Sequence, residues 1–330
     1  MARFVIGLAS GATTVIVPLS LGEYSCDVLK GKLGTIHQLG IVIGIFLAQL
    51  AGVFLSTTAN WRYLFASGIV FLIPQLILAL KLPESPRYLF DSGRKDECFK
   101  VLSLLRGTDE VEEEIQSYQI NKKQEQPKKY FLTSLFSKEA RKSMTIGVIM
   151  HLIQQFSGIN AVFYFSTRIF SSGGTEGYAT LITMAIGVVN IVATIVSLNL
   201  IDVSGRRKLT LISTGTMSLF AGLLVLSMVF EFTAIRVISI FLYVFAFAVG
   251  LGPIPWLIIC ELFPGDLVPL AASLLVGINW ISNFIVGFTF EYLVESLENL
   301  FFLPYGVLLF IAFVFFYVFL PETKYHKGYL

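Results

Sequence analysis

The residues best suited to chemistry in this sequence are side-chain amides set inside strongly apolar segments. Each amide offers both hydrogen-bond donors and acceptors, so a group of them can replace the water around a neutral polar solute. Burying an amide in lipid is costly, which favours amides that line a shared cavity. The alternative is that they only join neighbouring helices. The amides at comparable depth in four such segments are Gln38, Gln154, Gln155, Asn160, Asn190, Asn279 and Asn283.

A second set of residues is charged and stands where the apolar segments end. If these acids and bases pair between two halves of the protein, they hold one end closed and separate when the halves move. Exposed pairs contribute only about 0–1 kcal/mol each, so several are needed to bias a transition. The alternative is that the basic residues only orient the chain in a membrane, which leaves the acids unexplained. The set comprises Glu23, Glu84, Arg87, Asp202, Arg206, Arg207, Glu261 and Glu322.

Glycine and proline weaken two of the apolar segments close to these amides. Residues 250–256 contain two glycines and two prolines before Trp256, and proline removes a backbone donor and kinks a helix. A weakened helix beside a large ring suits a hinge with a gate, although an ordinary interfacial tryptophan is the alternative. Gly158 similarly precedes Asn160. Tyr164 lies further along the same segment and is either an outer gate or a core filler.

The composition shows which class of protein holds these residues. Of 330 residues, 55% are hydrophobic and 14% are charged, and the mean hydropathy is +0.76. Soluble domains carry about 25% charged residues, so a disordered chain, a nucleic-acid binder and an ordinary cytosolic enzyme are excluded. Three cysteines without metal-type spacing predict neither a disulfide framework nor a zinc site. No cofactor or enzyme motif is recognised, and a polytopic all-α membrane protein remains.

Nine apolar segments approach the roughly 20 residues that a bilayer-spanning helix needs. A charged, helix-patterned stretch at 83–143 separates three segments from six. It divides the chain into a partial bundle at 1–82, a linker at 83–143, a six-helix bundle at 144–320 and a tail at 321–330. The nine segments are 3–21, 33–55, 62–82, 144–169, 178–201, 209–230, 236–260, 268–290 and 300–320.

The distribution of lysine and arginine predicts the orientation of these segments. When alternate loops are assigned to one side, that side holds 20 of the 24 Lys and Arg residues. The positive-inside rule then places the linker and the C-terminus in the cytoplasm and the N-terminus outside. We expect a multi-pass protein of the plasma membrane.

Two landmarks recur in the chain at one offset. Glu84 and Glu322 follow the third and ninth segments, and Glu23 and Glu261 follow the first and seventh; both pairs are 238 residues apart. A constant offset indicates a parallel duplication of transporter halves, although two matches can arise by chance. On this interpretation, segments one to three correspond to segments seven to nine. Partners of segments four to six would then precede Met1, so about three spans are expected to be missing.

Several motifs resemble those of the sugar porters, the facilitative glucose transporter branch of the major facilitator superfamily. They cover essentially the whole chain. The matching stretches are GTIHQLG at 34–40, PESPR at 83–87, QQFSGINAVFY at 154–164, DVSGRR at 202–207, GPIPW at 252–256 and PETK at 321–324.

This resemblance implies a twelve-span fold of which nine spans are present, starting at the fourth. It implies a small-molecule sugar as the partner, together with the lipid bilayer and without nucleic acid; the oligomeric state stays open. Trp256 would stack on the sugar ring as part of the gate. The implied hexose contacts are Gln38, Gln154, Gln155, Asn160, Asn190, Gly252, Trp256 and Asn283, with Asn279 as a neighbour.

The energy source is inferred from the charges inside the segments. None of the nine has an Asp or Glu in its interior, which favours passive hexose uniport over proton coupling. His37 and His151 are interpreted as structural hydrogen-bonding residues. A proton-coupled sugar or polyol symporter stays open, because the family's coupling acid belongs to the first span. A chain of the same fold that does not transport by itself also stays open, since amide-bearing helices would lack partners.

Overall fold

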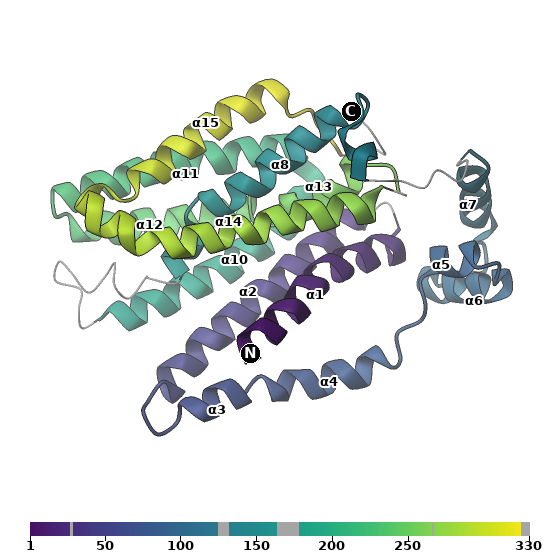
Figure 1. Ribbon diagram of the computed structural model, residues 1–330, viewed down its shortest axis with the longest axis horizontal. Coiled ribbons are helices and arrows are strands. Elements are labelled where there is room, and N and C mark those ends of the chain that lie inside the picture. The colour runs from purple at the N-terminus through teal and green to yellow at the C-terminus, as the bar shows by residue number, and fades with distance from the viewer. Residues whose placement is uncertain (27–28, 125–131, 164–177, 266, 325–330) are drawn as a thin grey trace.

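The computed structural model describes residues 1–26, 29–124, 132–163, 178–265 and 267–324. Within these ranges every regular element is a helix (Figure 1), which agrees with the predicted all-α class. Backbone groups in lipid must be paired internally, and helices achieve this within one segment. The longer helices outside the linker are α1 (Ala2–Tyr24), α2 (Lys30–Leu55), α8 (Arg141–Phe156), α10 (Ala179–Ser204), α11 (Arg206–Val229), α12 (Thr233–Val249), α14 (Val268–Leu297) and α15 (Leu303–Phe319).

The predicted spans appear as eight long apolar helical segments and one shorter helix, α15. At 1.5 Å per residue the 17 residues of α15 extend about 26 Å, near the lower limit for crossing a bilayer. The third span is divided into α3 (Trp61–Ala66) and α4 (Ile69–Ala79). The seventh is divided into α12 and α13 (Ile254–Leu262). The end of the fourth, 164–169, lies outside the described residues.

Helices α8 and α10–α15 form one body with a continuous apolar core. Within it α11 packs between α12 and α15, and α8 packs on α14. Tyr243, Phe290, Phe302 and Phe316 are among its largest fully buried side chains. Helices α1 and α2 lie along one side of this body, α1 against α14 and α2 against α10 (Figure 1).

The α3–α4 segment and the linker extend away from this body. No residue of α3 or α4 is buried, and α4 runs apart from α1 (Figure 1). The linker contains α5 (Pro86–Asp91), α6 (Lys95–Arg106) and α7 (Glu112–Gln124) and has its own small core around Leu102. Arg106 joins it to the membrane helices, because its guanidinium donates to the Tyr24 carbonyl (2.8 Å) and pairs with Glu114 (2.7 Å).

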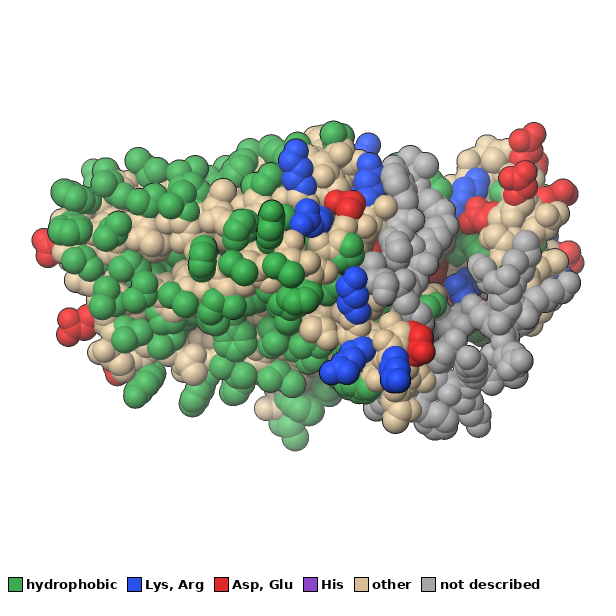
Figure 2. All heavy atoms as spheres, turned by 90° about the horizontal axis from the view of Figure 1, so that it is seen from above, with side chains coloured by type: hydrophobic (Ala, Val, Ile, Leu, Met, Phe, Trp, Pro, Cys, Tyr) green, Lys and Arg blue, Asp and Glu red, His purple; other side chains and the backbone are tan. Residues whose placement is uncertain are grey.

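The surface is divided between a long apolar flank and a charged end. Hydrophobic side chains cover most of the face seen in Figure 2, while Lys and Arg gather at the end nearest the linker. We call this end the basic end. Exposed Phe and Leu side chains on many helices match a protein surrounded by lipid rather than water.

Candidate functional site

The break between α12 and α13 exposes backbone groups in the middle of an apolar helix pair. Gly250 departs from helical geometry (φ −131°, ψ −74°), and prolines follow at 253 and 255. Side chains from neighbouring helices satisfy the freed groups: Ser197 donates to the Val249 carbonyl (3.0 Å), and the Leu251 N–H donates to Ser213 (3.1 Å). The break is therefore a stable feature held by polar contacts inside the body.

Four amides form a chain of hydrogen bonds that starts at this break. Gln154 Nε2 donates to two backbone carbonyls of the break, that of Gly252 and that of the residue before it, at 2.9 Å each. Asn279 Nδ2 donates to Gln154 Oε1 (2.7 Å), and Gln155 Nε2 donates to Asn279 Oδ1 (2.8 Å). Asn160 Nδ2 completes the chain by donating to Gln155 Oε1. We call these four residues the amide network; it joins α8, α14 and the α12–α13 break.

Trp256 and Gln38 lie next to this network. The Trp256 ring stands edge-on between His37 and His151, with centroid distances of 6.3 and 5.4 Å. It is 7% exposed, and its Nε1 has no hydrogen-bond partner among the described residues. Gln38 approaches the α12–α13 break from α2, since its Nε2 would lie 3.5 Å from a methyl group on Gly252. The site thus includes a residue from the α1–α2 layer.

The other predicted contacts stand outside the network. Asn190 is buried on α10, but its Oδ1 has no partner among the described residues. Asn283 is one turn beyond Asn279 on α14, is partly exposed, and forms no hydrogen bond with a described residue. Tyr164, the predicted outer gate, lies outside the described residues.

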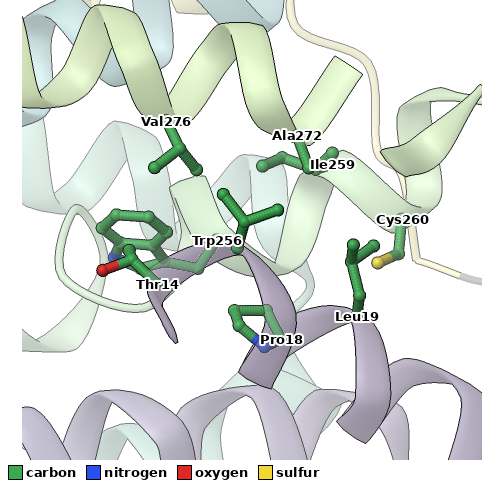
Figure 3. Close-up of a pocket in the computed structure, with 9 residues that line it drawn as sticks. Thr14, Pro18, Leu19, Trp256, Ile259, Cys260, Ala272 and Val276 are labelled. Carbon is green, nitrogen blue, oxygen red and sulfur yellow. The ribbon is translucent and has the colours of Figure 1, made fainter. Parts of the chain in front are cut away.

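A small pocket lies beside Trp256, between α1 and the helices α13 and α14 (Figure 3). Its volume is about 10 Å³, which is room for one water molecule and not for a sugar. Trp256 is the one predicted site residue that lines it. The lining residues are Thr14, Val15, Pro18, Leu19, Trp256, Ile259, Cys260, Ala272 and Val276.

The charged residues of the basic end form a compact cluster within residues 201–324. Arg206 is nearly fully buried and pairs with Glu261 (2.8 Å) and Asp202 (3.7 Å). Glu322 accepts the backbone N–H groups of Arg206 (2.8 Å) and Arg207 (3.2 Å). Carboxylates favour such positions, because α11 begins here and its N-terminus carries partial positive charge. The cluster ties together the ends of α10, α11, α13 and α15.

This arrangement differs from the expected pairing between halves. Glu23 and Glu84 are exposed and form no ion pair with a described residue. The close approaches to the linker and to α2 involve glycines: a methyl group on Gly31 would lie 2.0 Å from Asp202 Oδ1, and one on Gly265 would lie 2.5 Å from an Arg87 guanidinium nitrogen. The sequence could not predict these contacts, because they depend on which helix ends are neighbours.

Sequence reasoning missed the hydroxyl groups that support the site. Ser197 and Ser213 hold the α12–α13 break, and the Tyr243 hydroxyl donates to the carbonyl of Ser157, the residue after the end of α8. Glycine and proline in an apolar helix predict breaks, and a break leaves backbone groups that need hydrogen-bond partners. A serine or tyrosine inside a neighbouring apolar helix was therefore the available signal.

Comparisons with known proteins place this arrangement in a family. Residues 1–327 match the family described as Sugar (and other) transporter. The chain is 39% identical over 337 residues to the Gallus gallus solute carrier family 2, facilitated glucose transporter member 1, covering 98% of this chain and 68% of that protein. It is 38% identical over 335 residues to the Homo sapiens member 4, covering 98% and 65%. The chain therefore spans about two thirds of the length of these relatives.

The fold also matches a solved structure of the major facilitator superfamily. That structure is the proton:xylose symporter XylE bound to 6-bromo-6-deoxy-D-glucose. The TM-score is 0.82 at 27% identity, covering 94% of this chain and 68% of XylE. The chain has the major facilitator fold and is a multi-pass membrane protein. It belongs to the sugar transporter family and is not an enzyme.

Proposed function

We propose that this protein moves a glucose-like hexose across the membrane passively, by alternating access. The observation that carries this proposal is the amide network between α8, α14 and the α12–α13 break. Its donors and acceptors match the hydroxyl groups of a neutral sugar. The four amides bond to one another. Binding therefore exchanges amide–amide for amide–hydroxyl hydrogen bonds, a nearly balanced exchange that permits release.

The remaining predicted residues have roles around this network. Gln38, Asn190 and Asn283 supply further hydrogen bonds, and Trp256 stacks on the sugar ring between two histidines. Residues 1–82 and 144–320 act as the two moving parts, connected by the linker at 83–143. Tyr164 serves as the outer gate. The cluster around Arg206 stabilises the moving part at the basic end.

The orientation follows from charge. We place the basic end, the linker and the tail at 321–330 in the cytoplasm and the N-terminus outside, in the plasma membrane. The gathering of Lys and Arg at one end in Figure 2 supports this orientation.

Transport by the purified protein in lipid vesicles tests the proposal. We expect uptake of labelled D-glucose that unlabelled D-glucose, but not L-glucose, competes away. Asn279→Ala removes a donor and an acceptor that the bound sugar would use, worth about 0.5–1.5 kcal/mol each, so kcat/KM should fall about 5- to 150-fold. Asn199→Ala is the matched control, because that amide is exposed on α10 and bonds only within its own helix. Uptake no faster than in empty vesicles, with normal insertion, would refute the proposal.

A second candidate function is proton-coupled sugar transport. The similarity to XylE, a proton:xylose symporter, supports it. An imposed proton gradient separates the two candidates: accumulation of sugar above equilibrium indicates coupling, whereas passive transport only equalises the two sides.

A further inference from the structure

Helix α8 breaks in the middle of the amide network. The helix ends at Phe156, Gly158 adopts a left-handed conformation (φ +77°), and helical geometry resumes at Ile159. Gln155 lies just before the break and Asn160 just after it, and their side chains are hydrogen bonded to each other. The conformation of two residues, Ser157 and Gly158, therefore decides whether these two amides meet.

One side chain from another helix bonds directly to this break. The Tyr243 hydroxyl, on α12, donates a hydrogen bond to the Ser157 carbonyl. Both residues are fully buried. In an apolar interior a carbonyl at a helix break needs a partner, so this bond favours the conformation seen here.

The Tyr243 ring is fixed in place by an aromatic cluster. It stands edge-on to Phe302 at 6.0 Å, and Phe302 stands against Tyr305 at 5.7 Å. The Tyr305 ring lies where a side chain on Gly158 would go, 2.9 Å from the position of a methyl group. The Tyr305 hydroxyl, in contrast, is buried without a hydrogen-bond partner among the described residues.

We propose that the Tyr243 hydroxyl is a positioning group that holds the α8 break so that Asn160 meets Gln155 in the sugar site. Tyr243 does not contact the sugar in this proposal; it acts through the backbone at Ser157. The inference rests on the proposed function for its consequence in transport, but its structural part stands on the hydrogen bond, the glycine conformation and the amide pair.

Tyr243→Phe tests the transport consequence, since it removes one hydroxyl and keeps the ring. Loss of one hydrogen bond predicts a rise in KM of roughly 2- to 12-fold with little change in kcat. Tyr305→Phe is the matched control, because it removes an unpartnered hydroxyl beside the same break and should leave KM unchanged. In an Asn160→Ala background, Tyr243→Phe should have almost no further effect. An equal effect in both backgrounds would mean that Tyr243 is merely structural and would overturn the proposal.

Hydrogen–deuterium exchange tests the structural part without any sugar. Amides of residues 157–162 should exchange faster in Tyr243→Phe than in the unaltered protein or in Tyr305→Phe, while α11 stays unchanged. Unchanged exchange at the break overturns the inference even if the protein transports glucose. If the unaltered protein fails to transport but exchange at the break responds, the proposed function fails and the positioning role survives.

Discussion

Substituting Gly31 should open the protein at its basic end. In Gly31→Ala the added methyl group would lie 2.0 Å from Asp202 Oδ1 and 3.1 Å from an Arg206 guanidinium nitrogen. The carboxylate would have to move about 1.4 Å to reach an ordinary contact of 3.4 Å. The carboxylate is the end of a flexible side chain and can turn away, which weakens its 3.7 Å pairing with Arg206; this cost arises only while α2 rests on α10.

The magnitude follows from the cost of overpacking. Overpacking a rigid contact costs about 1–3 kcal/mol, but Asp202 can give way at the cost of a partly exposed ion pair, so we expect about 1 kcal/mol, which is a population shift of about 5-fold towards the open state. The cost falls on the state in which α2 and α10 touch. The open state has no such contact and is unaffected.

Labelling of Cys260 measures this shift. Its sulfur would lie 3.6 Å from a methyl group on Gly22 of α1, so α1 partly covers it while α1 rests on α13. In a background with Cys26→Ser and Cys98→Ser, the rate of reaction with N-ethylmaleimide should rise with the open population. When the open state is rare, the labelling rate is proportional to its population.

The matched control for this experiment is Gly40→Ala. Gly40 lies on the same helix, and a methyl group there would have no neighbour within 4 Å. In Gly40→Ala, Cys260 should react with N-ethylmaleimide at the same rate as in the protein that keeps both glycines. Equal rates in Gly31→Ala and Gly40→Ala, with both proteins folded, would refute the close contact between α2 and α10.

Three further substitutions test separate parts of the structure. Arg206→Ala leaves the mostly buried Glu261 carboxylate without its cation and should cost about 3–5 kcal/mol, seen as a lower Tm, while the exposed pair removed by Arg94→Ala should leave Tm unchanged. Arg106→Ala should release the linker and speed its proteolysis without changing the membrane helices. Gly158→Ala forces a side chain into a left-handed conformation against an aromatic ring and should destabilise the protein by about 1–3 kcal/mol, whereas Gly287→Ala, which has open space, should not.

The fold was largely predictable because membrane spans are encoded by length and hydropathy. The nine predicted segments correspond to eight long helical segments and the shorter α15. The prediction did not place the break that separates α3 from α4. Its signals were weak: Gly68 at the boundary and Pro74 within α4 are residues that membrane helices often tolerate.

The candidate site was predictable in composition but not in connectivity. Depth along the chain identified Gln154, Gln155, Asn160 and Asn279, and the structure brings these four together. Depth alone could not separate them from Asn190, which is another buried amide but has no bond into the network. Which amide meets which depends on helix rotation and on helix breaks, and neither leaves a periodic signal.

The partners of the charged residues were also not predictable from the sequence, for a different reason. Arg206, Glu261 and Glu322 were expected to pair between halves, but the structure joins them within one body. The sequence locates each residue at a helix end, and several ends lie at the same membrane surface. Only the packing of α11 against α15, and the position of α13, decides that these three are neighbours.

The two helix breaks and the amide network form one mechanical unit. Gln154 bonds to the α12–α13 break and through Asn279 to Gln155, which in turn bonds to Asn160 beyond the α8 break. Movement at either break therefore strains hydrogen bonds between amide groups, and the same groups would bind the proposed sugar. A sugar that replaces those bonds releases the breaks from each other, so occupancy itself would lower the cost of moving. Binding and gating then depend on the same atoms, and substitutions of the four amides themselves, unlike Tyr243→Phe, should change KM and the transport rate together.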